Sequence, residues 1–202
     1  MKTREIILIK SLEMFNSKGL LSISLRDIAK ELVISYGNLT YHYPNKENII
    51  TWLCVQMMEE LDEAAKIIRN VNSTFETVLK APELSFEILY KYRFLFQDNV
   101  EIIRKYPGIA LLLKQIINSG KADHFNLFNE LKEQGIMRLE IGEREVNYLI
   151  DIQADLKNMF FMNLVEKENA HSFKKEYINY VNGLIYPYLT PKGIRYFESK
   201  YI

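Results

Sequence analysis

The chain has 202 residues, of which 48% are hydrophobic and 26% charged, the proportions of an ordinary globular protein. Its 26 basic and 26 acidic residues cancel, which excludes a polycation that binds nucleic acid over its whole surface. Cys54 is the only cysteine and no apolar run approaches the ~18 residues of a membrane span, so we expect a cytoplasmic protein without an intrachain disulfide.

The beginning of the chain predicts two helices in succession. The first covers residues 4–18, where apolar side chains recur at helical spacing, and Gly19 suits a left-handed C-cap. The second starts after Ser24, whose hydroxyl can cap it together with Asp27 three residues later.

A third, two-turn helix follows a tight turn, with Ser35 as its predicted cap and Pro44 as its end. Leu39 and Tyr43 lie four residues apart and are expected to point inward together. The outer face then carries Tyr36, Gly37, Asn38, Thr40, Tyr41 and His42. A polar and aromatic outer face on so short a helix fits a recognition helix that meets DNA, and a solvated surface is the alternative.

The run SLRDIAKELVIS-YGNLTYHYPNKENI resembles the helix-turn-helix of the tetracycline-repressor (TetR) family of bacterial transcription regulators, because LRDIA, GNL-x-YHY and NKE occur together at the family's spacing. Val33 stands where the family often has glycine. A β-branched residue resists positive φ, so we expect the turn to adopt a different backbone conformation here. The resemblance implies DNA contacts by Ser24, Arg26, Tyr36, Gly37, Asn38, Thr40, Tyr41, His42 and Lys46.

The resemblance also implies separate roles within that set. Tyr36, Asn38 and Thr40 are expected to read bases, while Gly37 lets the backbone approach the DNA closely. Lys46 begins the next helix, whose free amides already favour an anion, and it is expected to contact a phosphate.

The rest of the chain also reads as helical. Capping boxes are predicted at Ser73 with Glu76 and at Asp98 with Glu101, and Pro82 is expected in the first turn of a helix. The predicted helices cover about 46–69, 82–97, 109–134, 143–168 and 172–189, and Thr190 with Pro191 opens a short terminal one.

No strand-like alternation occurs, so the predicted fold class is all-α. We expect an N-terminal three-helix helix-turn-helix DNA-binding domain over residues 1–47. A C-terminal helical ligand-binding and dimerisation domain is expected over residues 48–202.

The body carries an aromatic stretch between residues 86 and 96 with two interpretations. It is either ordinary core or the wall of an apolar ligand cavity, which the family's body usually has. A mostly apolar pocket with a few polar groups is typical of small-molecule sites. The candidate ligand-binding residues are Trp52, Met58, Phe86, Tyr90, Phe94, Ile117, His124 and Phe128.

The last two long helices carry more apolar surface than one stripe each, which suggests a four-helix dimer interface. A fully buried pair inside a monomer is the alternative. The candidate interface residues are Leu149, Leu156, Phe160, Tyr177, Val181 and Leu184.

Catalytic and metal chemistry find no support in the sequence. The histidines at positions 42, 124 and 171 share no ligand spacing with one another or with Cys54. No glycine-rich phosphate loop or nucleophile elbow occurs. We therefore expect no metal site, no cofactor and no enzyme activity.

Together these patterns predict a TetR-like homodimeric transcription regulator. The simplest form is a repressor that an apolar or amphipathic small molecule releases from a palindromic operator. The alternatives are an activator, or a helical small-molecule-binding protein or enzyme that binds no operator.

Overall fold

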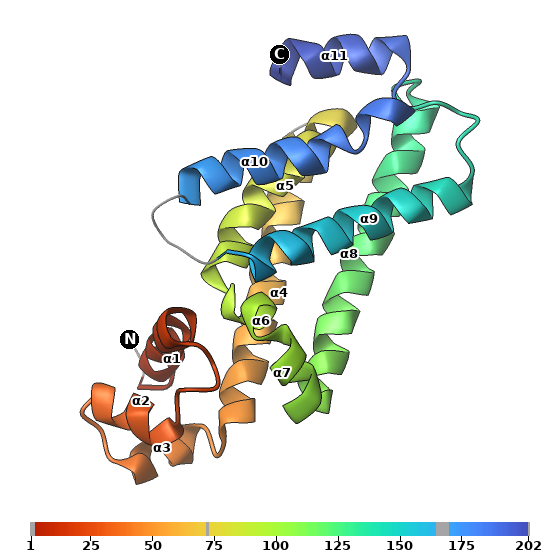
Figure 1. Cartoon of the computed structure of the whole chain (residues 1–202). Coiled ribbons are helices and arrows are strands. Elements are labelled where there is room, and N and C mark those ends of the chain that lie inside the picture. The colour runs from red at the N-terminus through yellow and green to blue at the C-terminus, as the bar shows by residue number, and fades with distance from the viewer. Residues whose placement is uncertain (1–2, 72, 165–169, 202) are drawn as a thin grey trace. The chain divides into compact units, whose positions relative to one another are not determined.

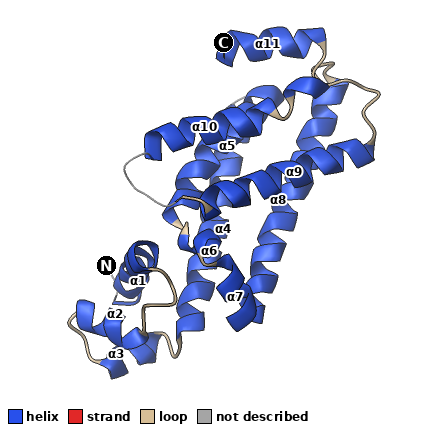
Figure 2. Cartoon of the chain, in the orientation of Figure 1, coloured by secondary structure: helices blue, strands red, loops and turns tan. Residues whose placement is uncertain are grey.

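The computed structural model of the chain describes residues 3–71, 73–164 and 170–201, and the regular elements in these ranges are helices (Figures 1 and 2). A single isolated β-bridge joins Met137 to Leu189. The all-α prediction is confirmed. None of the helices in these ranges combines the length and apolarity that crossing a bilayer requires.

The chain divides into two compact units. The first runs to Leu61 and includes Ile88–Gln115, and the second comprises Asp62–Glu87 and the chain from Ile116. All three borders fall inside helices, namely α4 (Lys46–Val71), α5 (Thr74–Lys91) and α8 (Pro107–Glu133). The functional border at residue 47 stays a prediction.

The first unit contains α1 (Thr3–Lys18), α2 (Leu25–Glu31) and α3 (Tyr36–His42), which form a three-helix head with the start of α4 (Figure 1). Gly19 has φ +79° and its amide donates to the Phe15 carbonyl at 3.0 Å, so the predicted left-handed C-cap is confirmed. Apolar side chains from all four helices are buried together, among them Ile7, Phe15, Ile28, Leu39, Tyr43, Ile49 and Ile50.

The same unit contains the short helices α6 (Phe94–Gln97) and α7 (Asn99–Lys105). The Phe94 ring packs against Phe15 with 5.3 Å between centroids. The predicted capping box of Asp98 with Glu101 is wrong, because the Asp98 carboxylate accepts from the Leu20 amide at 2.7 Å and caps no helix.

Helix α5 begins earlier than predicted. Ser73 accepts from the Glu76 amide at 3.3 Å, which confirms the cap, and the helix then continues through Pro82. The expectation that Pro82 opens a helix is therefore wrong. A proline inside a helix removes one backbone hydrogen bond, but buried Phe75 and Phe86 on either side of it hold α5 against the core.

The second unit is built from the end of α4, α5 up to Glu87, α8 from Ile116, α9 (Glu143–Met162), α10 (Ala170–Gly183), a 3-10 turn (Tyr186–Tyr188) and α11 (Pro191–Tyr201). Helices α9 and α10 lie side by side (Figure 1). The core draws on α5, α8, α9 and α11, through Phe75, Leu79, Phe128, Leu131, Val146, Leu149, Ile150 and Phe197.

The predicted ends of these helices are only partly matched. Helix α9 ends at Met162, and residues 165–168 of the predicted 143–168 helix lie outside the described residues. Thr190 caps α11 by accepting from the Gly193 amide at 3.2 Å, as predicted. Gly193 is required there by close packing, since a Cβ would lie 2.4 Å from the Ile136 carbonyl oxygen.

Candidate functional site

Helix α3 is fixed by local and long-range contacts. The Ser35 hydroxyl caps it by accepting from the Asn38 amide at 3.0 Å, as the sequence predicts. Leu39 and Tyr43 are both fully buried, which confirms that they point inward together. The Tyr43 hydroxyl accepts from Arg4 Nε at 3.2 Å, so α3 is tied to α1 at its C-terminal end.

The turn between α2 and α3 keeps a left-handed residue in spite of its sequence. Val33 has φ +56°, the only positive φ at a non-glycine position among the described residues. Its amide donates to the Lys30 carbonyl at 3.1 Å, and the Ile34 amide donates to the Ala29 carbonyl at 3.0 Å. These two bonds form a Schellman motif. The expectation that the turn adopts a different backbone conformation is therefore wrong. The two hydrogen bonds hold Val33 in the αL conformation, although valine disfavours it.

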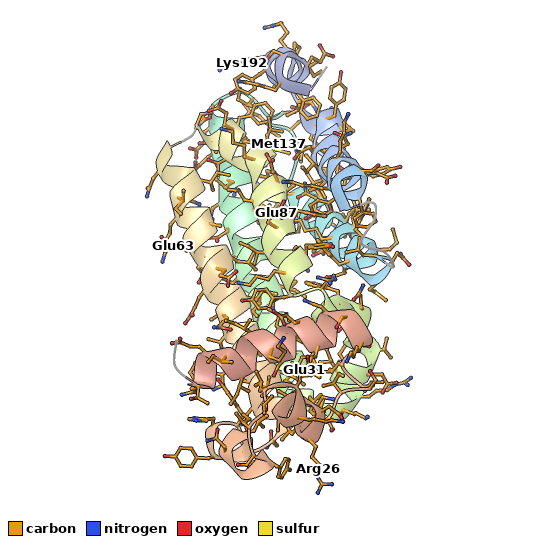
Figure 3. All side chains as sticks on the ribbon, turned by 90° about the vertical axis from the view of Figure 1, so that its left-hand side faces the viewer. Arg26, Glu31, Glu63, Glu87, Met137 and Lys192 are labelled. Atoms are coloured by element: carbon orange, nitrogen blue, oxygen red, sulfur yellow. The ribbon has the colours of Figure 1, made fainter. Side chains whose placement is uncertain are left out.

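The face of α3 opposite Leu39 is open. Tyr36, Gly37 and Asn38 are exposed, and Tyr41 has 83% of its surface accessible. The Arg26 guanidinium of α2 lies 5.5 Å from the Tyr36 ring centroid, and Figure 3 shows its side chain extending away from the ribbon. Two adjacent helices, α2 and α3, thus present four kinds of group together. These are the cation of Arg26, the ring of Tyr36, the side-chain amide of Asn38 and the bare backbone of Gly37.

Three other predicted contact residues already have partners within the head. The Thr40 hydroxyl donates to the Tyr36 carbonyl at 3.0 Å. The Ser24 hydroxyl donates to Asp27 at 2.5 Å, and this hydrogen bond lowers the pKa of the Asp27 carboxyl. His42 is half-buried, with its ring edge against Tyr41.

The Lys46 side chain is directed into the head and is not free to bind a phosphate in this position. Its ammonium donates to the Leu20 carbonyl and lies 5.6 Å from the centroid of the Phe15 ring. Burial, followed by the positive charge of Lys105, lowers the pKa of this half-buried group, and the Asp98 charge opposes them. The phosphate contact of Lys46 stays a prediction, and such a contact requires the side chain to leave this position.

Two family models match the chain over most of its length. The model described as "Bacterial regulatory proteins, tetR family" matches residues 7–51, which include the whole of α2, α3 and the turn between them. The model described as "Bacterial transcriptional repressor" matches residues 56–197. The chain belongs to the TetR family.

Solved structures resemble this TetR-family chain over more than nine-tenths of its length. A TetR-family transcriptional regulator from Marinobacter aquaeolei VT8 shares 29% identity, covering 96% of this chain and 95% of its own, with a TM-score of 0.85. The ketosteroid transcriptional regulator KstR2 of Mycobacterium tuberculosis has 16% identity, coverages of 94% and 96%, and a TM-score of 0.74. The fatty acid degradation regulator FadR from Bacillus halodurans has 16% identity, coverages of 92% and 95%, and a TM-score of 0.73.

No curated protein matches the sequence. The family models, together with the helix-turn-helix described above, make this TetR-family chain a DNA-binding transcriptional regulator. Its family and its structural neighbours are transcriptional regulators.

The predicted ligand-binding residues divide between the two units of this TetR-family chain. In the first unit Phe94 is fully buried against Phe15, and Trp52 lies under the Arg4 guanidinium at 4.2 Å. Tyr90 is covered by Arg93 in the same way at 4.7 Å, and Met58 is half-buried.

The second unit holds the remaining four. Phe86 packs against Phe161 and Tyr177, with 5.4 Å between centroids in each pair. Phe128 is fully buried and meets the His124 ring at 6.3 Å, whereas Ile117 is exposed. Their role in ligand binding stays a prediction.

Two polar residues that the sequence interpretation missed lie on the inward face of α9. Gln153 and Lys157 follow the apolar stripe that contains Ile150 and Phe161, at i, i+3, i+7 and i+11. The available signal was polar side chains in register with this apolar stripe, at buried Gln153 and half-buried Lys157. They were overlooked because the stripe was interpreted only as apolar surface.

The predicted dimer residues are distributed unevenly. Leu149, Tyr177 and Val181 are buried in the core of the second unit, so they present no surface to a partner. The sequence could not separate the two faces, because α9 and α10 are apolar on both. Leu156, Phe160 and Leu184 are half-buried, and the exposed apolar side chains on these helices are Tyr148, Ile152, Met159, Met162 and Tyr180.

Proposed function

We propose that the chain acts as a homodimeric repressor that binds a palindromic operator through α3 and is released from it by a small molecule. The observation that carries this proposal is the open outer face of α3. Its exposed residues have no role in the head's core, while Leu39 and Tyr43 on the opposite face are fully buried. A rigid helix with a free polar face is the arrangement that enters the major groove.

Each exposed group has a chemistry that suits DNA. The Asn38 side-chain amide can both accept from and donate to the major-groove edge of adenine. Arg26 can pair with a phosphate, and the Tyr41 hydroxyl can donate to one. Gly37 has no side chain, so its backbone can come closer to the duplex than any other part of α3.

The remaining predicted DNA contacts are made by residues that already have partners within the head. Ser24, Thr40 and His42 would contact DNA after their present partners rearrange, and Lys46 would have to leave the Leu20 carbonyl. We therefore assign specificity first to Tyr36 and Asn38.

Dimerisation is proposed through α9 and α10. The exposed Tyr148, Ile152 and Met159 lie at i, i+4 and i+11 on α9, and Tyr180 is exposed on α10. An apolar stripe of this kind suits a four-helix interface with a second copy. Two copies would place their α3 helices in successive major grooves, roughly 34 Å apart.

Release requires a ligand that prefers the conformation unable to bind DNA. Helices α4, α5 and α8 run through both units, so a ligand bound in the second unit can act on the first through continuous helix. Operator and ligand must then weaken each other's binding by the same factor.

Gel-shift selection from fragmented genomic DNA, repeated across a salt series, tests the DNA-binding part. Binding to phosphates gives a logarithmic affinity that falls steeply with the logarithm of salt concentration. We expect a selected palindromic fragment with such a slope, bound by a dimer. A protein that binds small molecules but shows no salt-dependent DNA binding would be a carrier instead, and the proposal would be wrong.

A further inference from the structure

The head is attached to the rest of the first unit by more than the continuous helix α4. Helix α5 ends at Lys91 and α6 begins at Phe94, and the two-residue break between them lies against α1 of the head. The Phe94 ring packs on Phe15 of α1 with 5.3 Å between centroids, and both rings are fully buried. Hydrogen bonds beside this apolar contact fix the break to the head more specifically, because they depend on direction.

Asn16 of α1 bonds to backbone groups on both sides of the break. In an uninterrupted helix the Lys91 carbonyl would accept from the Leu95 amide, but that amide donates to the Tyr92 carbonyl at 3.1 Å. The Lys91 carbonyl accepts instead from Asn16 Nδ2 at 2.7 Å, and the Phe94 amide donates to Asn16 Oδ1 at 3.1 Å. One side-chain amide of α1 thus caps both the end of α5 and the start of α6.

A third hydrogen bond reaches the head from the residue that precedes α7. The Asp98 carboxylate accepts from the Leu20 amide at 2.7 Å, and Leu20 lies in the loop that joins α1 to α2. The Lys46 ammonium donates to the carbonyl of the same residue, so both backbone groups of Leu20 are occupied. The loop before α2 is therefore held from the start of α7 and from α4 at once.

The break is also fixed to α4, far from the point where α4 leaves the head. The Tyr92 hydroxyl donates to Glu60 Oε1 at 2.7 Å, and the Tyr92 side chain is buried. The Lys91 ammonium lies 2.5 Å from the same oxygen. Glu60 lies roughly 20 Å beyond Lys46 along α4, at a rise of about 1.5 Å per residue. We call Asn16, Asp98 and Glu60, together with the groups that they bind, the brace.

The brace restricts how the head can move. A head held only by α4 could tilt or turn at the start of that helix, because a single connection leaves these rotations open. A second attachment at a separate place removes them, so the direction of α3 is set before DNA is bound. This matters for a dimer that reads two half-sites, because both α3 helices must reach their major grooves at one separation.

We propose that Asn16 and Asp98 are positioning residues for operator binding, which fix the direction of α3 and thereby set the half-site spacing that the dimer accepts. They act through α1 and through the loop before α2, without contacting DNA themselves. The inference rests on the operator binding by a dimer that is proposed above.

The test compares the selected operator fragment with two versions that carry one base pair more or one base pair fewer at the centre of the palindrome. One base pair turns the half-sites by about 35° relative to each other, because a turn of DNA takes about 10–10.5 base pairs. We expect the full-length wild type to bind both versions about tenfold less tightly in gel shifts. Asn16→Ala should reduce this ratio to about threefold or less, because a head that can turn follows either spacing and is no longer pre-organised for one.

The matched control is Ser17→Ala on the same helix. The Ser17 hydroxyl is exposed and donates to the Glu13 carbonyl within α1 at 2.8 Å, so this variant should keep the wild-type ratio. Asp98→Ala should lower the ratio as Asn16→Ala does. Asp98→Asn keeps an oxygen that can accept from the Leu20 amide, so it should retain most of the ratio. Asn16 is half-buried, so water can replace its amide and the variant should fold.

The ratio between fragments separates positioning from a general structural role. A head that is only less stable loses affinity for all three fragments by the same factor, so an unchanged ratio in Asn16→Ala overturns the inference. If that variant does not fold, an unchanged ratio in Asp98→Ala overturns it. A wild type that binds the three fragments equally also overturns it and leaves DNA recognition standing. A wild type that binds no fragment in a salt-dependent manner refutes the proposed function itself.

Discussion

Replacing Val33 by glycine should stabilise the protein, because the valine is held in a conformation that L-residues disfavour. A residue in the left-handed region costs about 1–2 kcal/mol, and a β-branched one has no compensating local hydrogen bond. Val33 is 92% exposed, so its removal loses almost no apolar burial. Its amide bond to the Lys30 carbonyl is made by the backbone and is kept by glycine.

Glycine has an opposing effect, because it makes the unfolded chain more flexible. The larger loss of conformational entropy on folding costs about 0.5–1 kcal/mol. The expected net gain in the free energy of unfolding is therefore about 0.5–1 kcal/mol. For a chain of this length such a gain raises Tm by roughly 1–4 °C. Thermal and urea unfolding at equal protein concentration measure it, because dimerisation makes Tm depend on concentration.

Val33→Ala is the matched control for this experiment. It removes the β-branch and keeps the Cβ that strains the αL conformation, so it should gain less than Val33→Gly. A Val33→Gly variant that is less stable than the wild type, or no more stable than Val33→Ala, would show that the turn stores no strain at this position. Operator affinity measured in parallel reveals whether the left-handed turn also serves DNA binding.

Four further outcomes are expected. Asn38→Ala should cost about 1–3 kcal/mol on the cognate operator and leave non-specific affinity nearly unchanged in gel shifts; equal losses on both would remove Asn38 from base reading. Gly37→Ala should fold normally, because the nearest atom to a Cβ there is Ser35 Oγ at 4.0 Å, but should weaken operator binding; unchanged affinity would mean that the backbone does not approach DNA. Between pH 8 and 10.5 the unfolded chain holds more protons at Lys157 than the folded chain, so this group contributes stability that rises with pH. Burial raises the pKa of Cys54 to about 12, which makes stability fall with pH above 9, so the expected signal is the stability of the wild type minus that of Lys157→Met, and this difference should rise across the window. Lys157→Met should also add about 1–3 kcal/mol at pH 7, and a destabilised variant would contradict a cation held without a partner. Met159→Glu should convert the dimer to a monomer in light scattering with its helical circular dichroism retained, and a persistent dimer would move the interface away from α9.

The sequence by itself determined the parts of this protein that depend on neighbours three to six residues apart. The caps at Ser24, Ser35 and Thr190 and the C-cap at Gly19 formed as predicted, because each bond joins groups within one helical turn. The inward pair of Leu39 and Tyr43 follows from helical periodicity in the same way. These local signals were enough to identify the helix-turn-helix and the face of α3 that it presents.

Where a local and a distant partner compete for the same side chain, only the tertiary structure decided which of them it contacts. Asp98 resembles a helix cap in the sequence, yet its carboxylate binds the Leu20 amide, 78 residues away. The Lys46 ammonium donates to the Leu20 carbonyl, which holds the side chain away from the surface. On α9, the buried and exposed apolar positions are alike in the sequence, and only the packing of α5, α8 and α10 selects which face is covered. The unpaired Oε1 of Gln153 becomes significant only once that burial is known, because an unpaired acceptor carries its cost only when water is excluded.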